Sequence, residues 1–333
     1  MGNPKISVVC LTYNHERYLE QCLEGFVSQK TNFAYEVIVH DDASTDNTAK
    51  IIEKYTAKYP EIIKPLYEKE NQYSKWKKIS PITANIILSL VRSEYIAICE
   101  GDDYWIDENK LQNQVDALDK HPQCHMCVCR TRVVNESGEA TKRIMPKIMI
   151  PSGLIDSKRF LEYCLNENFH TSGLTLRTAY MKDYYKHNCY FAQNCPVEDI
   201  PYRLYYASLG PVFYLSNIMT CYRTGSVSSV QKITSSTLSK KIEMHRIMIE
   251  TYRKYDEFTK HQYSDYCREN ILRNEFGILY CKGKYRSLLN PKYRIVFKHI
   301  NIKRKIDIVV SVFFPLSAKM IKKIILGTPN IGL

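Results

Sequence analysis

The sequence YIAICEGDDYW, at residues 95–105, joins an apolar run directly to three carboxylates. The run from Tyr95 to Cys99 has the composition of a buried strand, and Glu100, Asp102 and Asp103 follow it within four residues. Carboxylates this close repel one another, and each resists ionisation unless a positive charge lies among them. The stretch is therefore either a solvated acidic turn or a site that holds a cation.

Two earlier segments repeat this arrangement of a strand that ends in polar residues. Residues 5–11 and 35–40 read as strands, and the clusters TYNHE (12–16) and HDDAS (40–44) end them. Apolar spacing predicts helices over 16–29, 81–91 and 107–120. Strands that alternate with such helices predict an α/β protein with a Rossmann-like, mostly parallel sheet and helices on both faces. Because ligands of such sheets bind outside the carboxyl ends of the strands, the three clusters should line one site.

The remaining elements are predicted from shorter signals. A helix through Ile52 and Tyr55 would be capped by Ser44 or Thr45. Neither a Gly-x-Gly-x-x-Gly sequence after the first strand nor a phosphate loop is present, so side chains would bind the ligand in place of a glycine cradle. The other expected elements are a strand at 62–66, a loop at 71–78, a strand at 94–99, strand and loop at 124–149, the start of a strand at 170–177, a loop into a helix at 196–207 and a strand at 212–223.

The three strand-and-cluster segments follow one another within residues 4–130 as ISVVCLTYNHERYLEQCLEGFVSQ, YEVIVHDDASTDNT and SEYIAICEGDDYW. In this order they resemble the nucleotide-sugar-binding half of a family-2 glycosyltransferase with the GT-A fold, of the bacterial polysaccharide type. The resemblance implies an inverting enzyme that uses a nucleotide sugar. It also implies that Thr12, Tyr13 and Asn14 bind the donor, with the aromatic ring packed near the nucleotide base. Asp42 would accept a hydrogen bond from uracil, with Asp41 close by.

The sequence EGDDYW matches the family's Asp-x-Asp-Asp element, with Glu100 in place of the first Asp. The resemblance implies that Asp102 is the principal metal ligand, that Asp103 is a second ligand and that Glu100 is among the donor-binding residues. A hard divalent cation, Mn²⁺ or Mg²⁺, prefers carboxylate oxygens and also takes oxygens from a diphosphate. Such an ion would offset the repulsion among the carboxylates and neutralise charge on the departing nucleoside diphosphate. The cation site is therefore favoured over the solvated turn.

Further motifs lie in the second half of the chain. VEDIP (197–201) matches the family's Glu-Asp element, which implies that Asp199 is the general base for the acceptor hydroxyl. The alternative is that Glu198 and Asp199 are acids in the first turn of a helix, where the helix dipole favours them. YRTGSVSS (222–229) resembles the loop over the diphosphate, with Arg223 as the phosphate partner. HTSG (170–173) either faces the donor sugar or the acceptor, or is an ordinary start of a strand.

The twelve cysteines do not indicate a disulfide framework, because several lie in apolar stretches that read as strands. Buried free thiols of this kind fit a reducing cytosol. The cluster HPQCHMCVC (121–129) offers Cys124, Cys127 and Cys129 as zinc ligands, but no second pair follows at the spacing of a zinc ribbon or finger. The alternation of Cys127 and Cys129 with apolar residues favours a buried strand.

The positive charge is concentrated at the C-terminal end of the chain. The net charge is +12, and residues 282–323 contain twelve Lys or Arg and one acid, Asp307. Basic residues interleaved with apolar and aromatic ones suit an anionic membrane surface, a helical subdomain with a solvated basic face or, least favoured, a nucleic-acid groove. No nucleic-acid partner is expected. The predicted domains are 1–230, with a nucleotide-sugar-binding half (1–130) and an acceptor half (131–230), and a helical, basic region at 231–333.

The predicted function is the transfer of a sugar from a UDP-sugar to a hydroxyl of a glycan or lipid-linked acceptor in cell-surface polysaccharide synthesis. The alternative is a non-catalytic, membrane-associated binding module, against which the intact Asp102, Asp103 and Asp199 argue. A sugar nucleotidyltransferase is disfavoured because no glycine-rich loop follows the first strand. The sequence MGNPKISVV lacks the features of a signal peptide, and no apolar run reaches the roughly 20 residues of a membrane span. We expect a cytoplasmic protein, peripheral on the inner face of the cytoplasmic membrane if residues 282–323 bind lipid.

Overall fold

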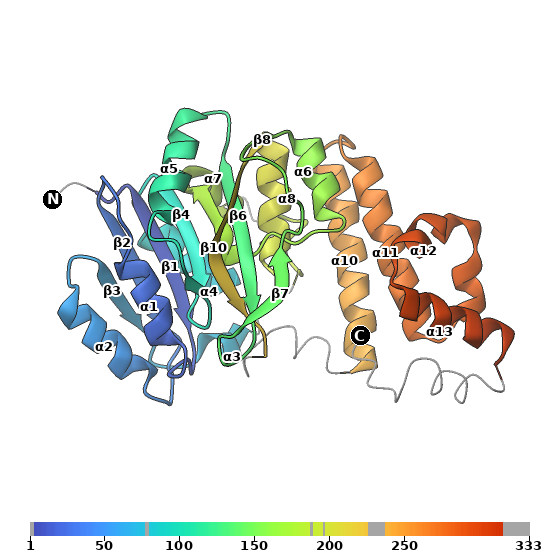
Figure 1. Cartoon of the computed structure of the whole chain (residues 1–333), viewed down its shortest axis with the longest axis horizontal. Helices are drawn as coiled ribbons and strands as arrows, with labels where there is room; N and C mark the ends of the chain where they lie inside the picture. The colour runs from blue at the N-terminus through green and yellow to red at the C-terminus, as the bar shows by residue number, and fades with distance from the viewer. Residues whose placement is uncertain (1–2, 77–79, 187–188, 196, 226–236, 316–333) are drawn as a thin grey trace. The chain divides into compact units, whose positions relative to one another are not determined.

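The computed structural model describes residues 3–76, 80–186, 189–195, 197–225 and 237–315 (Figure 1). The chain divides into two compact units. The first consists of Met1–Cys189 and Val197–Ser229, and the second of Tyr190–Pro196 and Val230–Leu333. The first unit contains the sheet and the three polar clusters, so the candidate site belongs to it.

Four parallel strands form the N-terminal part of the first unit. They are β1 (Ile6–Thr12), β2 (Tyr35–Asp41), β3 (Ile63–Tyr67) and β4 (Tyr95–Glu100), in the spatial order β3-β2-β1-β4. The register aligns their carboxyl ends, because Thr12 pairs with Asp41 and Leu11 pairs with Glu100. Nearly every residue of β1 and β4 is buried, which is typical of apolar strands covered on both faces.

Helices cover both faces of these strands, as predicted. Helices α1 (Leu19–Val27), α2 (Thr48–Lys58) and α5 (Lys110–Lys120) share one apolar core with alternate strand residues such as Val8 and Ala97. In Figure 1, α1 lies in front of β1, and α2 lies next to β3. The intervening strand residues, such as Val9 and Ile98, are also buried, and α4 (Ser80–Ser89) contributes buried apolar side chains of its own.

The remaining strands continue the same sheet in mixed directions. β9 (Leu174–Arg177) pairs antiparallel with β4 and with β6 (Met126–Val134), whereas β6 and β10 (Val212–Arg223) are parallel. The sheet is therefore parallel over β3-β2-β1-β4 and mixed beyond β4. The shorter elements of this part are β5 (Tyr104–Trp105), β7 (Ala140–Met145), β8 (Gly153–Ile155), α6 (Ser157–Cys164), the 3-10 turn η1 (Thr171–Gly173), α7 (Thr178–Lys186) and α8 (Asp199–Leu209).

Helices make up most of the second unit where the structure describes it. Part of it packs around one apolar cluster that includes Phe276, Tyr293 and Ile308. None of the helices in the described ranges is both long and apolar enough to cross a membrane. The elements are α10 (Leu238–Phe258), α11 (Ser264–Cys281), η2 (Tyr285–Leu289), η3 (Pro291–Tyr293), α12 (Arg294–His299) and α13 (Ile302–Phe313).

Two local predictions were wrong. Neither Ser44 nor Thr45 caps α2, because this helix begins at Thr48 and the Asp46 carboxylate accepts a hydrogen bond from the Thr48 N–H (2.9 Å). The Ser44 hydroxyl instead donates to the Asp41 carboxylate. The loop expected at 71–78 contains a short helix, α3 (Gln72–Trp76). Most other boundaries differ from the predicted ones by one to three residues, and the strand at 212–223 is observed over the same range.

Cysteine behaves as the strand interpretation predicts. Cys127 and Cys129 lie in β6 and are buried, as is Cys124 just before it. Burial raises the pKa of the Cys129 thiol to about 11, so the thiol stays protonated and packs as a small apolar group.

Candidate functional site

The three polar clusters meet at the carboxyl edge of the parallel strands. The backbone amide of Asp42 donates to the Thr12 oxygen (3.0 Å), and the amide of Gly101 donates to the Leu11 oxygen (2.9 Å). The segments after β1, β2 and β4 therefore lie side by side, although they are far apart in the sequence. This is the arrangement that the sequence predicts for the strand ends of a parallel sheet.

Side chains join the loops after β1 and β2 to each other. Asn14 Oδ1 accepts from the Thr45 N–H (2.8 Å), and the Asn14 N–H donates to Ser44 Oγ (2.9 Å). The His15 N–H donates to Thr48 Oγ1 (2.8 Å). Asn14 has the left-handed φ of 54°, a conformation that Asn tolerates better than most residues. Tyr13, directly before Asn14, is 37% exposed, so its ring is accessible to a ligand.

The two aspartates after β2 are buried and already hydrogen-bonded. Asp42 Oδ1 accepts from the Gln72 N–H (2.6 Å) and Asp42 Oδ2 from the Tyr73 N–H (3.0 Å). Asp42 thus holds the first turn of α3, which explains why a helix forms where a loop was expected. Each carboxylate oxygen has a second lone pair, so these bonds leave Asp41 and Asp42 able to accept from a ligand as well.

The acidic turn after β4 packs tightly against the end of β1. A Cβ atom at Gly101 would lie 2.6 Å from Thr12 Cγ2 and 2.9 Å from His15 Nδ1. Only glycine fits at this distance, so the spacing Glu-Gly-Asp-Asp lets the turn lie directly on the first loop. Burial lowers the pKa of the neighbouring His15.

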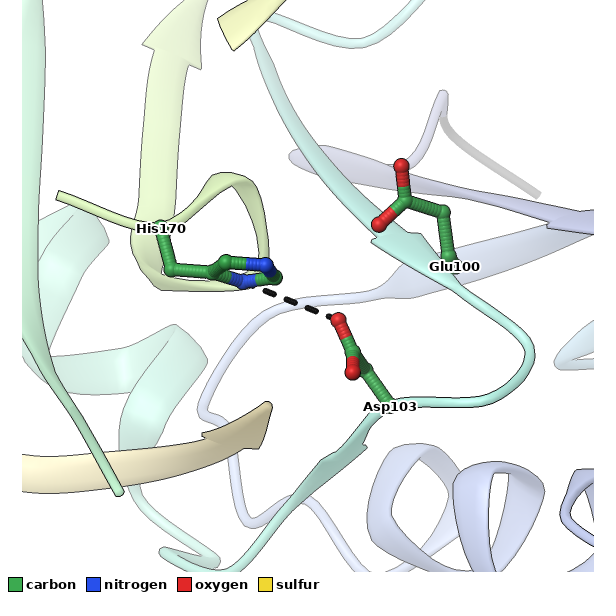
Figure 2. A group of neighbouring side chains, drawn as sticks. All are labelled: Glu100, Asp103 and His170. Carbon is green, nitrogen blue, oxygen red and sulfur yellow. Dashed lines mark ion pairs between the residues drawn. The ribbon is translucent and has the colours of Figure 1, made fainter. Parts of the chain in front are cut away.

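Glu100, Asp103 and His170 form a cluster of metal-ligand type at this edge (Figure 2). One ligand atom from each residue lies within 4.8 Å of the others, and His170 Nδ1 is 3.6 Å from Asp103 Oδ2. Burial and the charge of Asp102 raise the pKa of Glu100 to about 8, and the same two causes raise the pKa of Asp103. Burial lowers the pKa of His170 to about 3.

These groups fit a divalent cation. Asp103 is 1% exposed, and its Oδ2 atom accepts no hydrogen bond within the described ranges of the chain. A buried carboxylate oxygen without a donor is costly unless a positive charge reaches it. Glu100 and Asp103 come from the predicted acidic cluster. His170 enters it as the residue directly before η1, and the sequence signalled it only as part of the HTSG motif.

Arg223 lies against the backbone of the acidic turn. Its Nε donates to the Asp102 oxygen (2.9 Å), its Nη1 to the Glu136 oxygen (2.9 Å) and its Nη2 to Gln21 Oε1 (2.7 Å). Its backbone N–H donates to Asp103 Oδ1 (2.9 Å). Arg223 therefore fixes this turn, and its contact with the donor phosphates stays a prediction.

Asp199 is the first residue of α8. Its Oδ2 lies 3.3 Å from Arg203 Nη2, and its Oδ1 is buried without a hydrogen-bond donor among the described residues. Arg203 also donates to the Phe169 oxygen (3.1 Å), directly before His170. The start of α8 and the turn that carries His170 are thus held by one guanidinium.

The sequence model of the family described as glycosyl transferase family 2 matches residues 7–185, which is more than half of the chain. The chain therefore belongs to this family. An uncharacterized protein of Mycobacterium bovis is 42% identical over 143 residues, 42% of this chain and 39% of that protein. The poly(ribitol-phosphate) beta-N-acetylglucosaminyltransferase TarS of Staphylococcus aureus is 29% identical over 182 residues, 54% of this chain and 28% of TarS. The chain thus spans about two-fifths of the length of the mycobacterial relative.

Two solved structures share the fold. The structure of S. aureus TarS residues 1–349 in complex with UDP-GlcNAc has a TM-score of 0.60 at 18% identity, and the match covers 96% of this chain and 88% of that one. The mannosyltransferase PcManGT of Pyrobaculum calidifontis, in complex with GDP-Man and Mn²⁺, has a TM-score of 0.54 at 14% identity, with coverage of 97% and 84%. The fold is therefore GT-A, as the resemblance implied.

Proposed function

We propose that the chain is an inverting glycosyltransferase that moves a sugar from a UDP-sugar to a hydroxyl of a glycan or lipid-linked acceptor, in cell-surface polysaccharide synthesis. The observation that carries the proposal is the meeting of three polar loops and a buried acidic cluster at one edge of the sheet. Membership of glycosyl transferase family 2 supports it. Residues 1–230 would carry the transfer and residues 231–333 a contact with membrane.

The donor nucleotide would bind to the joined loops after β1 and β2. Thr12, Tyr13 and Asn14 come from the first loop, and the exposed ring of Tyr13 is placed to pack on a base. Asp41 and Asp42 come from the second, where a spare lone pair on Asp42 would accept the uracil N–H. UDP-GlcNAc in the TarS structure supports a UDP-sugar as the donor.

Glu100, Asp102 and Asp103 would hold a divalent cation, Mn²⁺ or Mg²⁺, next to the donor diphosphate. The orphaned Asp103 Oδ2 supports this assignment, as does the Mn²⁺ that PcManGT binds with its nucleotide sugar. When bound, the cation would neutralise the charge that develops on the departing UDP. Arg223 would add positive charge beside the same phosphates, while its guanidinium keeps the acidic turn in place.

Asp199 would act as the general base. Arg203 occupies the side of Asp199 Oδ2, which leaves Oδ1 as the oxygen that can take a proton. As the acceptor hydroxyl oxygen forms its bond to the anomeric carbon, its proton moves to Asp199 Oδ1. The bond from that carbon to the diphosphate oxygen breaks on the opposite face, and its electron pair leaves with UDP. One displacement of this kind inverts the anomeric configuration.

The basic C-terminal segment would bind an anionic membrane surface through α13, which would make the protein peripheral on the cytoplasmic face. Ile302, Val309 and Phe313 are 68%, 40% and 64% exposed, and their helical spacing places them on one face. Lys303 and Lys305 lie in the first turn of the helix, one on each side of this face. Exposed apolar residues flanked by lysines suit an interfacial helix. Residues 316–323 of the predicted segment lie outside the described ranges.

A nucleotide-sugar hydrolysis assay tests the proposal directly. The full chain would be incubated with a panel of UDP-sugars and Mn²⁺, and the release of UDP would be measured with and without EDTA. We expect release from at least one UDP-sugar, loss of that release with EDTA, and recovery when Mn²⁺ is restored. Thermal stabilisation by UDP without any turnover on the panel, with acceptor glycans present, would instead favour a binding module.

A further inference from the structure

We propose that His170 is a direct ligand of the cation, with Glu100 and Asp103, and that its nitrogen makes the site prefer Mn²⁺ over Mg²⁺. The inference rests on the proposed metal-assisted transfer and deepens it. The sequence motifs predict only carboxylate ligands for this site. A site made of oxygen ligands alone would bind Mg²⁺ as well as Mn²⁺. A nitrogen ligand at His170, directly before η1, changes the chemistry of the site.

The hydrogen bonds of His170 show which ring atom is free for a cation. The Ser172 N–H donates to Nδ1 (3.3 Å). A backbone N–H can only donate, so Nδ1 carries a lone pair and no proton. A neutral imidazole is the form that binds metals.

Nδ1 and Asp103 Oδ2 therefore face each other as two lone-pair donors, 3.6 Å apart. This distance is too long for a hydrogen bond, and Oδ2 accepts no hydrogen bond from any residue in the described part of the chain. The second oxygen, Oδ1, is already bound by the Arg223 N–H (2.9 Å). In Figure 2 the His170 ring edge and the Asp103 carboxylate point toward each other, and the Glu100 carboxylate lies next to both side chains. A positive charge between the three groups would remove this repulsion.

The spacing of these atoms suits a shared ion. Two ligands at about 2.1 Å from one ion lie roughly 3.0–3.4 Å apart when the angle between them is near octahedral or tetrahedral. The 3.6 Å between His170 Nδ1 and Asp103 Oδ2 is close to this range. The Ser172 hydroxyl, 2.9 Å from Nδ1, has a second acceptor in Thr220 Oγ1 at 3.2 Å. It can therefore turn away from Nδ1 when an ion arrives, without losing its partner.

The ring is held in place by its neighbours, so the ligand is preorganised. Tyr222 packs against it with the ring centroids 4.2 Å apart. Arg203 binds the backbone oxygen of the preceding Phe169 (3.1 Å). Mg²⁺ prefers oxygen ligands and near-ideal octahedral geometry, whereas imidazole suits first-row transition metals. A fixed imidazole nitrogen therefore favours Mn²⁺ or Co²⁺ over Mg²⁺ at this site.

The test is a titration of the full chain with Mn²⁺ in the presence of UDP, in which free Mn²⁺ is followed by its EPR signal and Mg²⁺ is added as a competitor. His170→Ala removes the donor, and His170→Asn places an amide oxygen close to the position of Nδ1. We expect His170→Ala to weaken Mn²⁺ binding about tenfold or more. His170→Asn should bind Mg²⁺ as wild type does but lose the preference for Mn²⁺.

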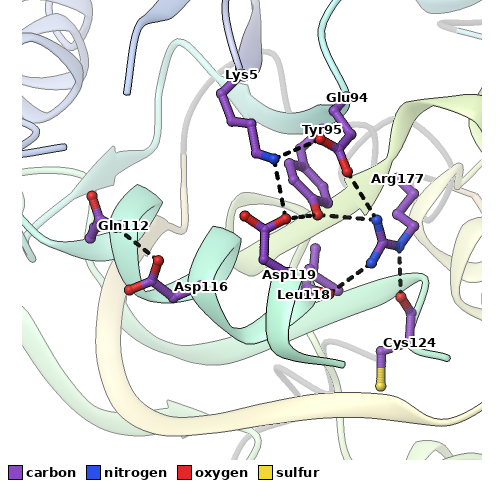
Figure 3. Close-up of polar contacts among 9 residues, drawn as sticks. All are labelled: Lys5, Glu94, Tyr95, Gln112, Asp116, Leu118, Asp119, Cys124 and Arg177. Carbon is purple, nitrogen blue, oxygen red and sulfur yellow. Dashed lines mark hydrogen bonds and ion pairs between the residues drawn. The ribbon is translucent and has the colours of Figure 1, made fainter. Parts of the chain in front are cut away.

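His125→Ala is the matched control. His125 lies next to Cys124, whose backbone oxygen accepts from Arg177 in the polar network at the amino ends of the strands (Figure 3). This network lies at the opposite edge of the sheet from Glu100, so the control should bind both ions as wild type does. Circular dichroism melting of each variant shows that the fold is retained.

The outcomes separate this inference from the proposed function. If wild type binds Mn²⁺ with UDP and both His170 variants keep the same affinity and the same Mn²⁺/Mg²⁺ ratio, His170 is not a ligand, although the metal-assisted transfer stands. If wild type itself binds neither ion with UDP, the metal-assisted function is wrong, and this inference is wrong with it.

Discussion

Arg223 Nε donates a hydrogen bond to the backbone oxygen of Asp102 at 2.9 Å, across 121 residues of sequence. The same guanidinium also binds the Glu136 oxygen and Gln21 Oε1, so Arg223 ties the acidic turn to α1 and to the loop between β6 and β7. A turn that carries three carboxylates would otherwise be pushed open by their repulsion. The proposed cation site is thus held in place by an arginine from the far end of the first unit's sequence.

Replacing Arg223 with lysine should therefore damage the site while the positive charge is retained. One ammonium cannot reproduce the fork of Nε, Nη1 and Nη2, and the buried oxygens left without donors cost about 1–3 kcal/mol. We expect a lower free energy of unfolding in urea and weaker Mn²⁺ binding. Arg17→Lys, at an exposed ion pair with Glu136, is the control and should change neither. Wild-type stability in Arg223→Lys would show that the charge alone suffices.

Gly101→Ala should displace the acidic turn. The added Cβ would meet Thr12 Cγ2 at 2.6 Å and His15 Nδ1 at 2.9 Å, so the turn or the first loop must move. We expect weaker UDP binding by calorimetry and a lower melting temperature. Thr12→Ser removes Cγ2 but keeps the hydroxyl that bonds the His40 oxygen. The double variant Thr12→Ser/Gly101→Ala should recover part of the loss, and a double variant no better than Gly101→Ala would contradict this account of the packing.

Asp102→Asn should abolish transfer and remove the effect of Mn²⁺ on UDP affinity. The neutral amide is a poorer ligand than a carboxylate and no longer offsets the ion's charge. UDP affinity would be measured by calorimetry with Mn²⁺ and with EDTA, for wild type and variant. The two curves should differ for wild type and coincide for Asp102→Asn. If the variant responds to Mn²⁺ as wild type does, Asp102 is not a ligand.

Asp199→Asn should lower turnover by about 10²-fold or more, the usual scale for a lost general base, while UDP affinity hardly changes. The reason is that an amide in the same place cannot take the acceptor's proton. Asp116→Asn, on the surface of α5, is the matched control. Near-normal turnover in Asp199→Asn would return Glu198 and Asp199 to the interpretation as acids at the start of a helix.

Binding to anionic vesicles tests the membrane contact of α13. Each basic residue near such a surface contributes about 1 kcal/mol, and salt screens the attraction within about 8 Å. Cosedimentation should therefore fall steeply with added salt and be weak with neutral vesicles. Phe313→Ser should reduce binding several-fold, while Leu238→Ser, an exposed apolar residue in α10, should not. Salt-insensitive binding, or none, would leave α13 as a solvated basic helix.

Much of the site was predictable because parallel strands align their carboxyl ends. The clusters at Asn14, Asp41 and Glu100 each follow an apolar run, and the sheet register places them together. The partner His170 was not predictable, because β9 enters the sheet antiparallel and its position beside β4 depends on tertiary packing. The helix at 72–76 was missed for a similar reason, since the Asp42 carboxylate that holds it lies thirty residues away.

The polar network at the opposite edge of the sheet was also not predictable from the sequence (Figure 3). Arg177 donates to the backbone oxygens of Leu118 (2.7 Å) and Cys124 (2.9 Å), and Lys5 lies 2.6 Å from Glu94. None of these pairs has a local sequence signal. Charged residues at strand ends read as solvent-exposed until the fold brings their partners within reach.

The hydrogen bonds between the loops after β1 and β2 reduce the conformational entropy that these loops would lose when a ligand binds. The backbone of Asn14 and His15 is already fixed by Ser44 and Thr48 before any ligand arrives. Ordering a free residue costs roughly 1–2 kcal/mol, so a nucleotide that binds to this pair of loops, as proposed, would not incur that loss. Differences in sugar preference among engineered variants should therefore be sought outside this pair of loops. Substitutions within it would change affinity for every nucleotide sugar alike.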